Sequence, residues 1–257
     1  MKGSRTAFID FNNYRRQCKD SIMNEFQIYI SKINFDYWKN KNAYYSKTSL
    51  SPSMQASLKI IQGQGYLTSF YPKNAYEIIS KIENEIEQFD FKNPDFKKLA
   101  IIFDLIQAWG GRQGRQPYIA AYKSRDKFED WKLIYIESCK LCVGKMPEQA
   151  LKKLVEIKGM GIPFATKHIR FWGKFPILDT RLSLILTGAK NFNDYNKFLS
   201  MLKELAATWN CDSTEAEKAI FAFSQHYFPN EKLTLKQMNF DEDMDILIAK
   251  KISKLKS

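Results

Sequence analysis

Residues 154–182, LVEIKGMGIPFATKHIRFWGKFPILDTRL, form the most informative stretch of the chain. Apolar residues at helical spacing lead into a Gly-Met-Gly turn, and a second helical pattern begins beside Pro163. A short Gly/Pro loop follows, after which Asp179 opens another helical pattern. The stretch therefore predicts a helix, a tight hairpin, a second helix, a loop, and a carboxylate at the start of a third helix.

The rest of the chain also has helical spacing, with no convincing strand pattern, so we expect an all-α fold. The pattern that starts at residue 93 is almost entirely apolar, which predicts a deeply buried helix. The aromatic and polar stretch 35–53 is interpreted as a loop. We divide the chain into an N-terminal helical region (1–92), a helical core (93–190) and C-terminal helices (191–257).

The chain is strongly basic. It has 40 Lys and Arg against 28 Asp and Glu, a net charge of +12, which suits a polyanion such as nucleic acid. The alternative is a basic protein whose lysines only keep it soluble. The sequence has no apolar run near the ~20 residues of a membrane span and no signal-peptide pattern. We expect a cytoplasmic monomer, at the nucleoid if the source is bacterial, without membrane contact.

The cysteines do not predict a metal site. Cys139 and Cys142 form a CxxC pair inside a helical pattern, and no second pair lies at zinc or iron–sulfur spacing. We therefore interpret these two residues as reduced thiols, partly in the core, and expect no bound metal and no required cofactor.

The Gly159-Met160-Gly161 turn can be interpreted in two ways. Glycines allow a tight turn, and the free amides of the hairpin and of the next helix start can donate to a phosphate. Alternatively, the turn is only a helix end followed by a new helix. On the first interpretation the expected DNA contacts include both basic side chains and the hairpin backbone. They are Lys158, Gly159, Met160, Gly161, Ile162, Thr166 and Arg170, with Arg112 and Arg115 from the Gly/Arg-rich segment 110–125.

The sequence resembles a known family at these motifs. LVEIKGMGIPFATKHI is similar to the helix-hairpin-helix of the base-excision DNA glycosylases, and FPILDTRL is similar to their Gly/Pro loop and catalytic aspartate. This superfamily includes endonuclease III, the adenine mismatch glycosylase and the 8-oxoguanine glycosylases. The resemblance covers roughly residues 146–190. AWGGRQGRQPY (108–118) also resembles a bacterial branch of 8-oxoguanine-glycosylase-like proteins.

The resemblance implies a two-lobed helical fold of the helix-hairpin-helix glycosylase type, with its active site in the cleft between the lobes. The hairpin (154–170) and the aspartate loop (173–181) would lie at that cleft, and 191–257 would complete the second lobe. It implies double-stranded DNA with one nucleotide flipped out, Asp179 as the catalytic carboxylate, and backbone contacts from Gly159 and Gly161 to phosphate. Relatives often bind a monovalent cation at the hairpin. Only Cys211 follows Asp179, so the iron–sulfur cluster of some relatives is not expected.

The chemistry of base release agrees with a single carboxylate. Breaking an N-glycosidic bond develops positive charge on the sugar, and a carboxylate in a water-poor site stabilises that charge. The alternative for Asp179 is an ordinary helix N-cap, which is compatible with catalysis. Pro163 occupies the position of the lysine that lyase relatives use, which favours a monofunctional enzyme. Lys167 lies one helical turn later, either as a phosphate contact or as a Schiff-base nucleophile that would give abasic-site lyase activity.

Three aromatic residues are candidates for a base pocket: Trp109, Tyr118 and Phe164. An aromatic ring can stack on a flipped base, but Trp109 could equally be a core residue, and Phe164 is usually one in this setting.

We therefore expect a DNA N-glycosylase, with 8-oxoguanine as the first candidate base. An alkylated base, or a bulky modified cytosine of phage DNA removed in defence, is also compatible. A non-catalytic helix-hairpin-helix DNA-binding protein is the main alternative, and a purely structural helical protein is the third.

Overall fold

The computed structural model describes residues 24–47, 49–63, 68–110, 128–190, 192–228 and 244–255, and these parts form an all-helical fold. The one exception to helix and loop among them is an isolated antiparallel bridge between Ser49 and Asn74. The predicted all-α class is therefore confirmed. The helices are α2 (Glu25–Ile30), α3 (Phe35–Lys47), α4 (Pro52–Gly63), α5 (Ala75–Glu87), α6 (Phe96–Gly110), α8 (Phe128–Val143), α9 (Pro147–Leu154), α10 (Ile162–Gly173), α11 (Thr180–Thr187), α12 (Tyr195–Thr208), α13 (Ser213–Tyr227) and α14 (Met244–Lys254).

Short polar side chains set the starts of several helices. Asn24, Asn74, Asp194 and Asp212 each accept a hydrogen bond from a backbone N–H in the first turn of the helix that follows. Such a cap satisfies one of the four N–H groups that a helix start leaves without an internal partner. Asn24 and Asp212 also form complete capping boxes, in which the third helical residue bonds back to the cap.

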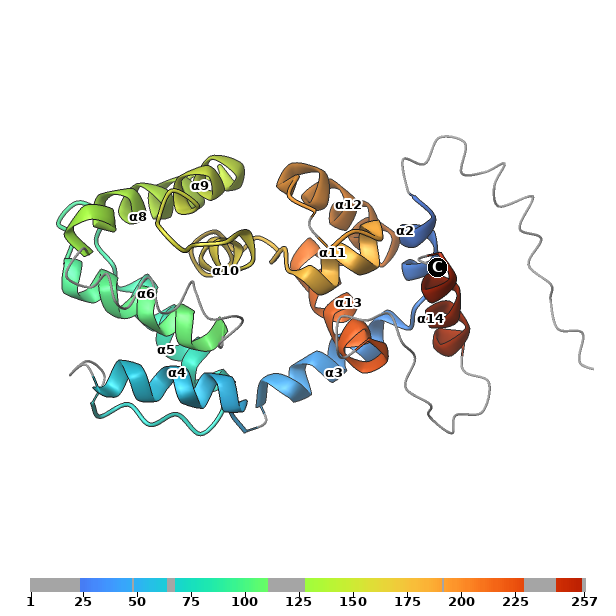
Figure 1. The fold of residues 1–257 in the computed structure, drawn as a ribbon, viewed down its shortest axis with the longest axis horizontal. Helices are drawn as coiled ribbons and strands as arrows, with labels where there is room; N and C mark the ends of the chain where they lie inside the picture. Colours follow the sequence, from blue (N-terminus) through green and yellow to red (C-terminus); the bar gives the residue numbers. More distant parts are fainter. Residues whose placement is uncertain are drawn as a thin grey trace, which may run out of the picture.

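The helices form two groups that lie side by side (Figure 1). The first group contains α4, α5, α6, α8, α9 and α10, and the second contains α2, α3, α11, α12, α13 and α14. The chain passes between the groups twice, from α3 to α4 and from α10 to α11. The second crossing runs through the loop that carries Asp179, so this residue lies where the two groups join.

Helix α6 is the central element of the first group. Its residues Leu99, Ile102, Leu105, Ile106 and Ala108 have no measurable exposure, which confirms the deeply buried helix predicted from its apolar sequence. Helices α4, α5 and α10 all pack against it. It therefore supplies the rigid surface on which α10 and the hairpin are placed.

The loop predicted for residues 35–53 is wrong over most of its length, because residues 35–47 form α3. This helix packs against α13. Trp38 is 2% exposed, lies edge-on to Phe223 with ring centroids 5.6 Å apart, and donates from Nε1 to Asp245 at 2.6 Å. Aromatic anchors replace the aliphatic repeat that usually identifies an amphipathic helix, so the pattern was not recognised.

Residues near the start of the described chain are bonded to helices of its last third in the second group. The Asn24 side chain donates to the Leu186 carbonyl at 2.9 Å, and Gln27 donates to Glu204 at 3.1 Å. Trp209 donates from Nε1 to the Ser31 carbonyl at 3.0 Å. These bonds join α2 and the turn after it to α11 and α12.

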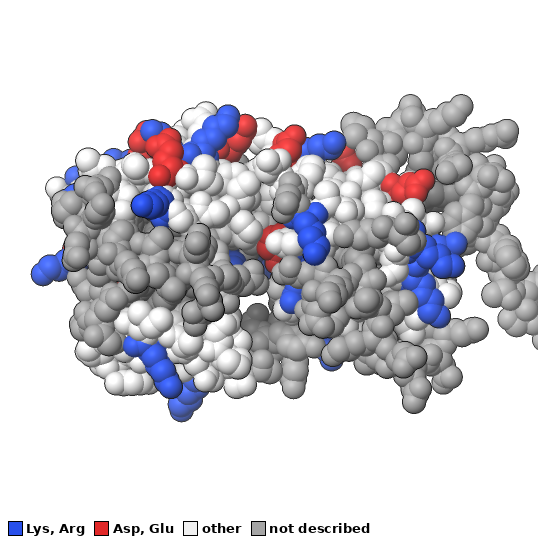
Figure 2. Space-filling model, in the orientation of Figure 1, with Lys and Arg blue, Asp and Glu red and all other residues white. Residues whose placement is uncertain are grey.

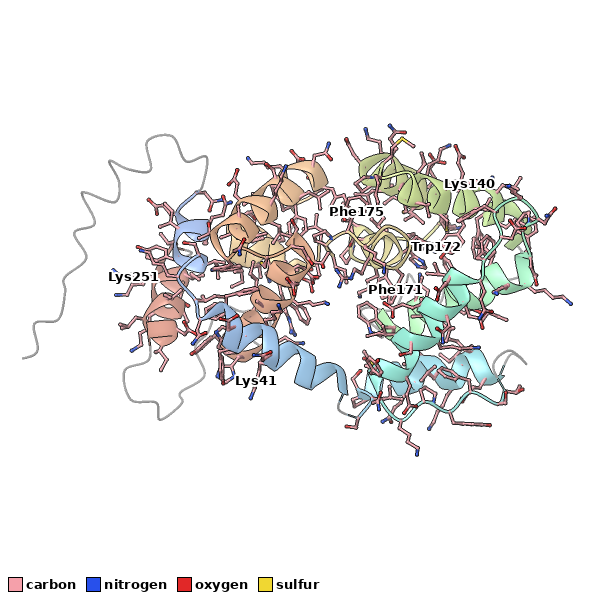
Figure 3. The ribbon with its side chains drawn as sticks, turned by 180° about the vertical axis from the view of Figure 1, so that it is seen from behind. Lys41, Lys140, Phe171, Trp172, Phe175 and Lys251 are labelled. Carbon is pink, nitrogen blue, oxygen red and sulfur yellow. The ribbon has the colours of Figure 1, made fainter. Side chains whose placement is uncertain are left out.

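Positive charge is spread over several helices. Lys41, Lys140 and Lys251 extend from α3, α8 and α14 at the periphery (Figure 3). In the orientation of Figure 2, acidic side chains gather along the top, over α8, α9 and α12, whereas basic side chains also reach the lower edge. None of the helices described has both the length and the apolar composition needed to cross a bilayer.

Candidate active site

The turn between α9 and α10 is a glycine hairpin with an exposed backbone. Gly159 has φ of 89°, a left-handed conformation that L side chains rarely adopt. Gly161 caps α10 in an extended conformation, and no side chain bonds to the first turn of that helix. Lys158, Gly159 and Gly161 are all exposed. The hairpin therefore presents backbone amides, a helix start and one ammonium group to solvent, the combination that binds phosphate.

Met160, between the two glycines, points into the protein and not toward solvent. Met160 is 6% exposed, and its Sδ atom lies 3.8 Å from the side-chain nitrogen of Gln107 on α6. Ile162 is half-buried against the core. The side chains of Met160 and Ile162 thus anchor the hairpin, so any contact of these residues with DNA falls to their backbone.

Two hydrogen bonds position the loop between α10 and α11, and a third, within α10, orients the hydroxyl that makes one of them. The Thr166 hydroxyl accepts the Leu178 N–H at 3.1 Å and donates to the Ile162 carbonyl at 2.9 Å. Tyr195 of α12 donates to the Pro176 carbonyl at 2.6 Å. Thr166 has no exposed surface, so its side chain holds the loop in place and does not face the DNA contact surface predicted for it. The loop is therefore held from both groups of helices immediately before Asp179.

Asp179 is the N-cap of α11. Its Oδ1 atom accepts the Leu182 N–H at 2.9 Å, which fixes the orientation of the carboxyl group. Burial raises the pKa of this carboxyl above its ordinary value, while the Leu182 N–H and the charges of Lys167 and Arg181 act in the opposite direction. The carboxylate therefore has a defined position, a partly buried environment and cations nearby.

Lys167 lies on α10 and is only 8% exposed. Its ammonium group donates to the Gly110 carbonyl at 3.2 Å and lies 4.2 Å from the centroid of the Phe164 ring. Burial lowers its pKa from 10.5 to about 8, opposed by the negative charge of Asp179. A lysine in this environment is poorly placed to contact phosphate, and a substantial fraction of its amine is neutral near pH 8.

A glycine makes this arrangement of Lys167 possible. A Cβ atom on Gly110 would lie 2.9 Å from the Phe164 ring and 3.0 Å from Cδ of Lys167. Real Cβ atoms rarely come so close to a neighbour. Gly110 therefore allows the end of α6 to approach α10 and offers its carbonyl to the Lys167 ammonium group.

Two further ionisable groups lie near Asp179 and Lys167. Arg170, three residues after Lys167 on α10, has a buried Nη1 atom with no hydrogen-bond partner among the described residues. Glu217 on α13 is 6% exposed, and its pKa is raised from 4.5 to about 7 by burial, with the charge of Asp179 adding to the rise and that of Arg170 opposing it. Glu217 was not among the predicted site residues, although a glutamate inside the apolar stripe of residues 216–223 is a recognisable signal.

The predicted base-pocket aromatics lie at or near the core. Phe164 is 3% exposed, whereas Trp109 is half-buried and meets Phe171 edge-on, with ring centroids 5.0 Å apart. Figure 3 labels Phe171, Trp172 and Phe175 near the middle of the molecule, at the end of α10. Tyr118, Arg112 and Arg115 lie outside the described residues. Of the two predicted pocket aromatics that the structure describes, Trp109 is the one whose ring is exposed enough to stack on a base.

A buried polar network fixes α10 against α6 and α8. Trp172 donates from Nε1 to the Tyr135 hydroxyl at 3.1 Å, and this hydroxyl lies 2.9 Å from Nδ1 of His168. The other ring nitrogen of His168 lies 3.1 Å from the side-chain nitrogen of Gln107. Burial, followed by the charge of Lys167, lowers the pKa of His168 to about 3. The imidazole is therefore neutral at physiological pH and has a structural role.

The described residues contain no group of three or more His, Cys, Asp or Glu side chains that could hold a metal ion. A monovalent cation at the hairpin would need backbone carbonyls, of which that of Ile157 already accepts the Met160 N–H at 2.9 Å.

Comparisons of the chain with protein-family models, with curated proteins and with solved structures found no match in any of the three.

Proposed function

We propose that this protein is a DNA N-glycosylase that flips a modified base out of double-stranded DNA and hydrolyses its glycosidic bond. The observation that carries the proposal is the placement of Asp179, a capped and partly buried carboxylate next to a buried cation, Lys167. The exposed glycine hairpin lies at the other end of the same helix–loop unit. A site for DNA phosphate and a site for sugar chemistry are thus built from one continuous stretch.

The proposed reaction follows from the environment of the carboxylate. As the bond from C1′ to the base nitrogen breaks, positive charge develops on the deoxyribose. A fixed carboxylate in a water-poor site stabilises this charge without reorganising. The Leu182 N–H holds Asp179 in one orientation before the substrate arrives. Asp179 would also orient the water that attacks C1′.

The arrangement of the helices supports a substrate bound between the two groups. We infer that these groups correspond to the two lobes of the glycosylases that the sequence resembles. The flipped nucleotide would then enter beside Asp179, where the chain crosses from α10 to α11 (Figure 1). Trp109 is the described aromatic best placed to line its path. Among bases, 8-oxoguanine remains the first candidate, with alkylated bases and bulky modified cytosines of phage DNA as the alternatives.

One observation favours a covalent route as a second candidate. The lowered pKa of Lys167 leaves part of its amine neutral near pH 8, and a neutral amine is the form that attacks carbon. Attack on C1′ would give an imine between Lys167 and the opened sugar, followed by strand cleavage. Pro163, at the position of the lysine in lyase relatives, favours the water route instead.

The decisive experiment uses duplexes that each carry one modified base, including 8-oxoguanine, an alkylated purine and a glucosylated hydroxymethylcytosine. Base release is followed by alkaline cleavage of the labelled strand. We expect release from one of them by the wild type and none by Asp179→Asn, which keeps a capping side chain and so leaves folding intact. Salt-sensitive DNA binding without release from any duplex would instead support a non-catalytic DNA-binding protein.

A further inference from the structure

A second carboxyl group lies buried beside the first. Glu217 is 6% exposed, and no described residue donates a hydrogen bond to its carboxyl group or forms an ion pair with it. Buried polar groups in proteins nearly always have a partner, and buried carboxylates almost without exception. A mostly buried carboxyl group without such a partner can bond to a molecule that enters the site.

The packing of α13 turns the side of the helix that carries Glu217 toward the start of α11. The guanidinium group of Arg181, two residues after Asp179, lies 5.9 Å from the centroid of the Phe221 ring. Phe221 is four residues after Glu217, one turn along the same side of α13. The electrostatic interaction between Glu217 and Asp179 agrees with this geometry.

Arg170 completes the group from α10. It lies one turn after Lys167, so the two cations share a side of that helix. Its Nη1 atom is buried without a partner, and its charge acts on Glu217, yet the two side chains form no ion pair within 4.0 Å. The Nη1 atom of Arg170 is thus left available to a bound molecule within range of the charge on Glu217.

The charged groups that act on Glu217 come from three parts of the fold. They are Arg170 of α10, Asp179 before α11 and Lys218 of its own helix. Burial raises the pKa of Tyr195 of α12, and the charge of Glu217 adds to this rise. Asp179 also accepts the Leu182 N–H, whereas no described residue donates to Glu217, and the charge of Asp179 raises the pKa of Glu217.

We propose that Glu217 is the second carboxyl group of the Asp179 site and donates its proton to the base as the base departs. This inference rests on the proposed glycosylase function and extends it. Many glycosidases use two carboxyl groups in different environments. One is ionised and stabilises the positive charge on the sugar, and the other is protonated and donates its proton to the leaving group. Arg170 is then a positioning residue that holds the departing base or the attacking water near Glu217.

The proposed step balances. The electron pair of the bond between C1′ and the base nitrogen goes to the base, which takes the proton from the Glu217 carboxyl. A water molecule adds its oxygen to C1′ and gives one proton to the Glu217 carboxylate, restoring the starting state. One water is split across one bond, and neither an oxidant nor a further reactant is needed.

The test compares wild type, Glu217→Gln and the control Glu215→Gln on the duplex from which the wild type releases a base. Glu215 lies on the same helix in a capping box that glutamine preserves. Single-turnover release is measured from pH 5.5 to 9. We expect the wild-type and control rates to fall above about pH 7, following the ionisation of Glu217. The Glu217→Gln rate should be about 100-fold lower at pH 6 and should lack this fall. A Glu217→Gln profile that matches the control overturns the proposal.

A second measurement separates failure of this proposal from failure of the proposed function. The carboxyl carbon of Glu217 is titrated by NMR in the full-length protein, its signal identified by its loss in Glu217→Gln. We expect a midpoint near 7 that falls in Asp179→Asn, because the charge of Asp179 raises it. A midpoint in the ordinary glutamate range overturns the proposal even if base release is found. A midpoint near 7 without release from any duplex overturns the glycosylase function, and the proton-donor role with it.

Discussion

The Thr166 hydroxyl accepts the backbone N–H of Leu178 at 3.1 Å, which ties the middle of α10 to the residue directly before Asp179. Both residues are buried, so water cannot replace this bond. The position of the candidate catalytic carboxylate thus depends on a hydroxyl group thirteen residues earlier in the chain.

Replacing this hydroxyl should weaken both stability and activity. Thr166→Val keeps the shape of the side chain but leaves the Leu178 N–H buried without an acceptor, at a cost of about 1–3 kcal/mol. Thr166→Ser keeps the hydroxyl and should cost less than valine. Urea unfolding gives the stabilities, and base release by the folded fraction gives the effect on Asp179. A Thr166→Val protein as stable and as active as the wild type would show that the bond to Leu178 contributes nothing.

The two hairpin glycines should respond differently to alanine. Gly161 has φ of −85° and its nearest obstacle to a Cβ atom is 3.8 Å away, so Gly161→Ala should fold normally. Gly159 has φ of 89°, so Gly159→Ala should lose about 1–2 kcal/mol. If the hairpin backbone contacts phosphate, the methyl group of Gly161→Ala will obstruct it. Fluorescence anisotropy at two salt concentrations should then show at least tenfold weaker DNA binding, and unchanged binding would count against the hairpin as a DNA contact.

The covalent route through Lys167 makes a separate prediction. Borohydride reduction during the reaction should trap an enzyme–DNA adduct with the wild type at pH 8, because part of the amine is neutral there. Lys167→Gln should give no adduct, and Lys140→Gln, at an exposed lysine of α8, serves as the matched control. Base release without any trapped adduct would argue against the covalent route, and hydrolysis by water would be the route that remains.

The Glu217 carboxyl should make stability depend on pH. Its pKa is raised in the folded state from 4.5 to about 7, so the folded protein binds this proton more tightly than the unfolded chain does. The resulting stability is fully present below about pH 4.5 and is lost as the pH rises through 7. Glu217→Gln lacks this titration. Its free energy of unfolding relative to that of the wild type should therefore rise by up to about 3 kcal/mol between pH 5 and 8. Urea unfolding at a series of pH values tests this, and parallel curves for the two proteins would contradict it.

Much of the fold follows from local patterns. The apolar sequence of α6 predicted its burial, and Asp179 in its Asp-Thr-Arg-Leu context predicted a helix cap. The glycine turn was placed correctly between α9 and α10. These features depend on residues within one or two turns of one another, where spacing and side-chain chemistry determine the outcome.

Features that depend on distant partners were not predicted. Nothing near Thr166 in sequence indicates that its hydroxyl meets Leu178, and nothing near Lys167 indicates that it meets the Gly110 carbonyl. Glu217 acquires its environment from α10 and α11, which lie more than thirty residues earlier. Helix α3 does not follow from its local sequence, because its anchor, Trp38, packs against residues near the other end of the chain.

The pairing of α2 and α3 with α11–α14 also determines the order in which the chain can fold. The helices of the first group are contiguous in sequence, from residue 52 to residue 173, so they can assemble as they emerge from the ribosome. Residues 24–47 emerge before them and must wait for partners more than 130 residues later. Until synthesis reaches α13, the apolar surface around Trp38 lacks this partner, so we expect it to be exposed to aggregation during that interval.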